Sequence, residues 1–220
     1  MTTKKILAFV MLCSFALTAS AQQNDKYSAA MQKNISGLDS AFKNPDAMLA
    51  LANNFNRIGE AEKAQWLPFY YAAFCQVSYG YMQLEKNKDL VDDIAAKATE
   101  YLNKADALNP KNSEISCVKS MIATSIFLVN PMVRYNEYGP QSQQYLEDAK
   151  QQDTTNPRPY FLIGQGLRYT PEQFGGGCSA ALPILEEAAK KYETFVPASG
   201  IAPNWGKEVN SQLIKGCQNN

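Results

Sequence analysis

The stretch ATEYLNKADALNP, residues 98–110, contains the pattern that decides the fold. Ala98, Leu102 and Ala105 are spaced four and then three residues apart, and Pro110 follows them. In an α-helix these offsets place the three side chains on one face, where small residues let a neighbouring helix approach closely. The stretch therefore predicts a helix that packs tightly against another helix and ends before the proline.

The same spacing occurs twice more along the chain. A second pattern lies just before the last of these sets, on what we expect to be the preceding helix. Gly164 stands in this pattern at the expected point of closest contact with a neighbouring helix. Repetition in order favours a series of similar helical hairpins. The matching positions are Ser142, Leu146 and Ala149 in one set, Ala181, Leu185 and Ala188 in the other, and Tyr160, Ile163, Gly164 and Leu167 in the second pattern.

The chain after residue 21 has a helical pattern throughout, and proline or Asn-Pro punctuates it. Alternating strand patterns are absent, so we expect an all-α fold of antiparallel hairpins. The segments 129–139 and 169–178 are expected to be long loops within hairpins. An aromatic run from Trp66 to Phe74 is apolar on all sides of its helix, which predicts core. The expected helices cover residues 25–43, 46–62, 67–86, 88–108, 112–128, 140–152, 157–168, 179–194 and 204–216.

These positions resemble the tetratricopeptide repeat, in which helix A carries an aromatic and Leu-Gly and helix B carries Ala-x3-Leu-x2-Ala before a proline. Asn109-Pro110 and Asn156-Pro157 resemble the proline at its repeat junction. The resemblance covers residues 66–193 and implies a right-handed α-α superhelical solenoid with elongated A-to-B loops. It also implies a C-terminal capping helix at 204–216. A plain helical bundle with coincidental alanine spacing is the alternative fold.

The whole chain is also similar to exported tetratricopeptide-like proteins of Gram-negative bacteria. Stretches such as WLPFYYAA (66–73) and YTPEQFGGG (169–177) carry this similarity. It implies no particular activity, because the resemblance is to proteins without an established one.

The N-terminus has the layout of a secretory signal peptide. Lys4 and Lys5 precede an apolar run from Ile6 to Leu17, and the small residues 19–21 complete a cleavage site. The run is too short to span a bilayer. We therefore expect cleavage after Ala21, export to the periplasm or the extracellular medium, and one helical domain over residues 22–220.

Composition excludes several classes of function. The chain has no histidine, which excludes Ser-His-Asp and Cys-His nucleophiles and zinc sites with histidine ligands. Removing the leader lysines leaves 19 basic and 21 acidic residues, a balance that argues against a nucleic-acid partner. Adjacent acidic residues such as Glu186 and Glu187 point to different sides of a helix, so they form no obvious acid/base couple. The prediction is a protein that is not an enzyme and uses no cofactor or metal.

A candidate binding groove follows from the tetratricopeptide resemblance, which implies that A helices line a concave surface. If Pro157 begins a repeat, five residues of the next helix point inward and Glu172 follows in the adjoining loop. Arginine binds carboxylates bidentately and aromatics supply apolar area, chemistry that suits an acidic peptide or a sugar acid. In the alternative, the arginines form ordinary surface ion pairs. The predicted binding residues are Arg158, Phe161, Gln165, Arg168, Tyr169 and Glu172.

The leading functional prediction is a secreted or periplasmic binding or scaffold protein whose partner is a protein or peptide of the cell envelope. The alternative is a binding protein for a small ligand, a glycan or an acidic metabolite. A hydrolase that uses two carboxylates is a weaker third reading.

Four cysteines remain after cleavage of the leader, which allows disulfides in an exported chain. Cys178 opens one expected helix and Cys217 closes the capping helix, so an antiparallel pairing of these helices would allow a disulfide. Cys75 and Cys117 are expected at similar heights on successive A helices, where either a disulfide or two buried thiols fits.

Overall fold

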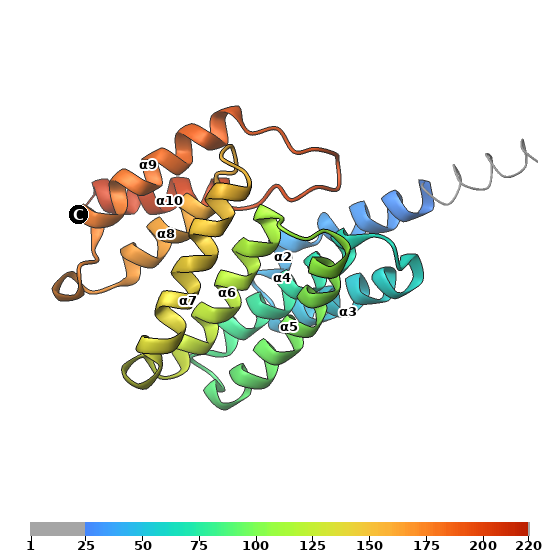
Figure 1. Cartoon of the computed structure of the whole chain (residues 1–220), viewed down its shortest axis with the longest axis horizontal. Helices are drawn as coiled ribbons and strands as arrows, with labels where there is room; N and C mark the ends of the chain where they lie inside the picture. The colour runs from blue at the N-terminus through green and yellow to red at the C-terminus, as the bar shows by residue number, and fades with distance from the viewer. Residues whose placement is uncertain (1–24, 220) are drawn as a thin grey trace, which may run out of the picture.

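The structure is a computed structural model that describes residues 25–219. The described residues are mostly α-helical and contain no strand, which confirms the expected all-α class (Figure 1). The predicted signal peptide and its cleavage site lie outside the described residues. The helices are 25–35, α2 (Leu38–Ala41), α3 (Pro45–Glu62), α4 (Trp66–Gln83), α5 (Val91–Leu108), α6 (Ser113–Val129), α7 (Pro131–Gln152), α8 (Arg158–Tyr169), α9 (Cys178–Thr194) and α10 (Lys207–Gln218), with 3₁₀ turns η1 (Lys88–Leu90) and η2 (Glu172–Phe174).

Asparagine side chains start two of the long helices. Asn44 caps α3 by accepting hydrogen bonds from the backbone N–H groups of Asp46 and Ala47, and Pro45 occupies the first turn. Asn112 caps α6 in the same way. Such caps satisfy N–H groups that have no partner inside the helix. The expected helix starts at residues 46 and 112 are confirmed to within one residue.

The expected loop at 129–139 is wrong, because helix α7 begins at Pro131, directly after α6 ends at Val129. Pro131 stands in the first turn, where its missing N–H has no helical partner to lose. Pro140 lies inside α7 and is exposed, so the carbonyl that its ring leaves without a helical bond can face water. The predicted helix start at residue 140 is therefore wrong, because Pro140 lies inside the single helix α7.

The long helices pack as successive antiparallel hairpins, α4 with α5, α6 with α7, and α8 with α9 (Figure 1). Helix α6 also contacts α4 and α8, so these three helices form one row, and α5 packs against α6 from the adjoining hairpin. Gly164 of α8 permits one close approach, since a Cβ there would lie 2.6 Å from Leu185 of α9. None of the described helices is long and apolar enough to cross a membrane.

The predicted aromatic core is confirmed. Phe69, Tyr70, Tyr71 and Phe74 of α4 are buried, and the Tyr71 ring stacks on Phe55 with centroids 5.0 Å apart. Alanines of the repeated pattern, such as Ala98, are also buried and line the contacts between helices. The main core therefore lies around α4, with its neighbours α3, α5 and α6 packed over it.

Candidate functional site

Arg158, the centre of the groove predicted from sequence, is fully buried. Its Nη1 donates to Glu114 Oε1 at 2.8 Å, and its Nη2 donates to the Pro203 carbonyl. The guanidinium also lies 4.7 Å from the Phe195 ring centroid and 5.3 Å from that of Trp205. The structure therefore places Arg158 in the interior and not at the surface of an open groove.

The segment 195–206, which joins α9 to α10, explains this burial. Tyr71 donates its hydroxyl to the Ile201 carbonyl, and the Trp205 indole N–H donates to the Tyr70 hydroxyl at 2.8 Å. Trp205 also packs on Phe74 and Phe161, with ring centroids 4.9 and 6.2 Å away. The segment thus covers α4 and the face of α8 on which the groove was predicted. Phe161, another predicted groove residue, is buried with it.

Glu114 is the acidic partner inside this buried network. Its carboxylate accepts hydrogen bonds from Arg158, from the Asn156 amide at 2.7 Å and from the Tyr70 hydroxyl at 3.1 Å. Burial raises the pKa of Glu114, while Arg158 and these hydrogen bonds act in the opposite direction. The network joins α4, α6, α8 and, through Pro203, the segment 195–206. Its geometry is that of a structural centre enclosed by protein.

The other predicted binding residues remain accessible. Gln165 and Arg168 of α8 are half-buried, whereas Tyr169 and Glu172 are exposed at the loop that follows. The structure thus separates the predicted set into a buried pair and four accessible residues. A binding role for these four stays a prediction.

Cys178 and Cys217 form a disulfide that joins the start of α9 to the end of α10. Cys75 and Cys117 are free and buried, the second of the two arrangements that the sequence allowed for them. Burial raises the pKa of both thiols, which keeps them protonated and unreactive.

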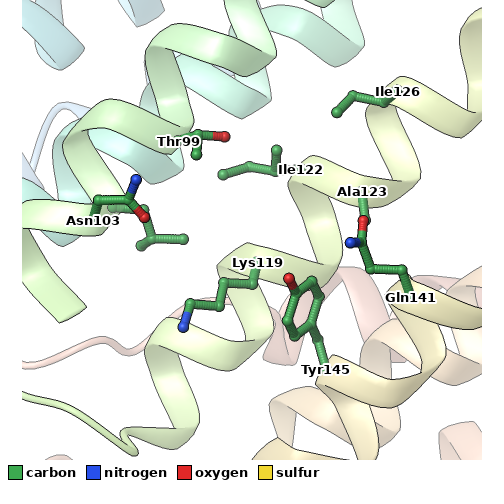
Figure 2. Close-up of a pocket in the computed structure, with 9 residues that line it drawn as sticks. Thr99, Asn103, Lys119, Ile122, Ala123, Ile126, Gln141 and Tyr145 are labelled. Carbon is green, nitrogen blue, oxygen red and sulfur yellow. The ribbon is translucent and has the colours of Figure 1, made fainter. Parts of the chain in front are cut away.

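A cleft of about 210 Å³ lies between α5, α6 and α7, and Figure 2 shows the side chains that line it. The apolar lining residues form the floor; Leu102, Ile122 and Ala123 are buried there, and Ile126 is half-buried. Polar side chains from α5 and α7 complete the lining. Lys119 of α6 extends toward α5 (Figure 2). The lining residues are Thr99, Leu102 and Asn103 of α5, Lys119, Ile122, Ala123 and Ile126 of α6, and Gln141 and Tyr145 of α7.

Sequence reasoning missed this cleft, although its floor follows a regular spacing. The four lining residues of α6 recur at offsets of three, four and seven, which is one face of a helix. The same spacing is typical of a core face, so it indicates burial before it indicates a ligand. The cleft exists because α5 and α7 both pack on α6 while leaving part of this face uncovered.

An ion pair joins the two walls of the cleft at one end. Arg134 of α7 binds Asp92 of α5 through both oxygens, at 2.6 and 2.7 Å, and donates to the carbonyl of the lining residue Ile126. The pKa of Asp92 is lowered by the hydrogen bonds from Arg134. A bidentate pair of this kind holds a fixed geometry, which defines the separation of α5 and α7 at this end.

Exposed apolar side chains cluster just beyond that end, at the turn between α6 and α7. Met132 is 89 % exposed, Val133 75 % and Tyr135 63 %, and the Tyr135 ring contacts Phe127. Large exposed apolar groups that lie together mark binding surfaces more often than isolated ones do. This turn is therefore a second candidate binding surface.

The residues that line the cleft offer apolar contacts, hydrogen bonds and one positive charge. Its lining combines aliphatic groups, hydroxyls, amides and one ammonium group. Within the described residues no cluster of His, Cys, Asp or Glu could hold a metal ion. The groups left accessible are polar side chains beside the half-buried Ile126 and Tyr145.

Comparisons with known proteins identify the family to which this chain belongs. A scan against protein-family models found no match, and no curated protein matched. Among solved structures, the chain is similar to the HusA haemophore from Porphyromonas gingivalis, with 36 % sequence identity and a TM-score of 0.76. The match covers 88 % of this chain and 93 % of the haemophore. The described residues are all-helical, and the chain belongs to the family of the HusA haemophore.

Proposed function

We propose that this protein is a haem carrier that binds haem without chemical conversion. The observation that carries the proposal is the match to a haemophore over nearly the whole of both chains. The match favours binding of a small ligand, the alternative function predicted from the sequence, over a role as a protein scaffold. The match also makes the proposed acidic ligand more specific, namely an apolar macrocycle that carries carboxylates.

The cleft between α5, α6 and α7 fits such a ligand in its chemistry. Haem is flat and largely apolar, with propionate carboxylates on one edge, and the cleft presents the half-buried Ile126 and Tyr145 with Lys119 beside them. Tyr145 belongs to a residue type that ligates haem iron in proteins. The volume of about 210 Å³ is below that of a pocket that encloses a whole ligand. The macrocycle would therefore enter by one edge and remain partly exposed.

We also propose that the helices form a tetratricopeptide-like solenoid and that the protein is exported from the cytoplasm. The row formed by α4, α6 and α8, with hairpins in sequence, supports a tetratricopeptide-like solenoid. In this arrangement the cleft lies on the side of α6 that faces the second helices of the hairpins. The predicted leader peptide supports export, which a carrier that collects haem outside the cytoplasm requires.

A substitution in the floor tests the location of the ligand. Replacing Ile126 with glutamate is expected to weaken haem binding about tenfold or more, because the floor loses apolar contact and gains a charge beneath the macrocycle. The measurement is a titration of the Soret absorbance of haemin.

Ile35→Glu is the matched control, since Ile35 is also half-buried against the main core but lies outside the cleft. Equal haem affinity in the two variants would contradict the assignment of haem to this cleft.

A second candidate function, docking to a protein of the cell envelope, is favoured by the exposed turn between α6 and α7. A photo-crosslinking residue in place of Met132 is expected to capture one defined partner in intact cells. The same residue in place of Val196, which is 82 % exposed elsewhere on the surface, serves as the control. The same products from both positions would contradict a specific role for this turn.

A further inference from the structure

Lys119 is the one cationic side chain among the nine residues that line the cleft. Its Nζ lies 2.8 Å from Oδ2 of Asp106 on α5, and the two side chains are 27 % and 33 % exposed. Asp106 follows the lining residues Leu102 and Asn103 by four and three positions, so it shares their face of α5. A carboxylate of the protein itself therefore occupies the cationic edge of the cleft.

This ion pair can be exchanged at low cost. Both partners are partly exposed to water, and pairs of this kind add little to stability. The ammonium group has three donors on a flexible stem, so it can turn from one carboxylate to another without movement of α6. The amide of Asn103 is a further donor on the adjoining wall.

The other cation near the cleft is less suited to this role. Arg134 donates to both oxygens of Asp92 and to the Ile126 carbonyl, so two side-chain nitrogens already make three hydrogen bonds. Releasing it would also remove a link between the two walls. Lys119 makes one such contact, to a carboxylate that water can replace.

We propose that Lys119 selects the ligand by binding one of its carboxylates in exchange for Asp106. The inference rests on the proposed function and gives the cleft a preference for ligands that combine an apolar body with an acidic edge. Asp106 acts as a built-in competitor, which holds the ammonium in place before the ligand enters. The half-buried Ile126 then supplies apolar contact, and Lys119 supplies discrimination between acidic and neutral ligands.

The test compares protoporphyrin IX with its dimethyl ester, which keeps the macrocycle and removes the acidic groups. Binding is measured by porphyrin fluorescence. Lys119→Met is expected to weaken binding of the acid about tenfold and to leave binding of the ester unchanged. Asp106→Asn is expected to strengthen binding of the acid several-fold, because the competing charge is gone. Lys104→Met is the matched control, since Lys104 also pairs with a carboxylate, Glu60, but does not line the cleft.

The outcomes separate the two levels of the proposal. Failure of both porphyrins to bind the native protein overturns this inference, and failure of iron(III) haemin to bind as well overturns the haem-carrier function. Binding of both porphyrins, with Lys119→Met affecting them equally or not at all, overturns the role of Lys119 and leaves the carrier function standing. Asp106→Asn keeps the test valid if Lys119→Met fails to fold, because a weakening or an unchanged affinity for the acid contradicts the exchange.

Discussion

Replacement of Arg158 with methionine is expected to lower the free energy of unfolding by about 3–5 kcal/mol, because it leaves the buried carboxylate of Glu114 without its cationic partner. The Arg158 side chain is 0 % exposed and that of Glu114 is 13 % exposed, so water cannot replace the lost ion pair. The variant also loses the hydrogen bond to the Pro203 carbonyl and the contacts with Phe195 and Trp205. Urea denaturation followed by circular dichroism measures the change.

Two further variants identify the cause of this loss. Arg57→Met removes an exposed arginine of α3 and is expected to change stability by less than about 0.5 kcal/mol. Adding Glu114→Leu to Arg158→Met is expected to restore part of the loss, because the unpaired charge is removed. A loss below about 1 kcal/mol in Arg158→Met would contradict the assignment of a buried structural ion pair.

Removal of the Cys178–Cys217 disulfide is expected to have an effect of similar size. The bond joins residues 39 positions apart, and the chain-entropy relation gives a stabilisation of about 4 kcal/mol for a loop of this length. The double replacement of both cysteines with serine should show this loss in urea denaturation. The enclosed segment includes 195–206, so opening the loop also frees the chain that covers Tyr70, Tyr71 and Arg158.

Reduction of the native protein provides the control for this prediction. Dithiothreitol is expected to destabilise the native chain by the same amount and to leave the serine variant unchanged, since Cys75 and Cys117 are already free. Equal stability of the native and serine proteins under oxidising conditions would contradict a stabilising role for the bond.

The fold could be predicted from local pattern to a large extent. The spacing of Ala98, Leu102 and Ala105 follows from helix geometry, and the structure buries all three against neighbouring helices. The error at 129–139 has a physical cause that the same pattern cannot show. A proline in an exposed helical turn is tolerated when the rest of the helix packs well, and this packing depends on the contact of α7 with α6.

The site was less predictable, because it depends on contacts between segments that are distant in sequence. Arg158 was expected at a groove from its place in a repeat, but the segment 195–206 covers it, and no local pattern indicates where a loop folds back. The face of α6 with Ile122 and Ile126 reads as core in sequence. Only the positions of α5 and α7 in space show that part of it remains open.

We propose that haem binds in the cleft between α5, α6 and α7. An amide-resolved NMR titration with iron(III) haemin tests it most directly, because the paramagnetic iron broadens the signals of nearby residues. We expect selective broadening of the amide signals of Ile122, Ile126 and Tyr145, with the signals of α3 and α9 unchanged. Broadening centred on α8, or no broadening at saturating haemin, would contradict it.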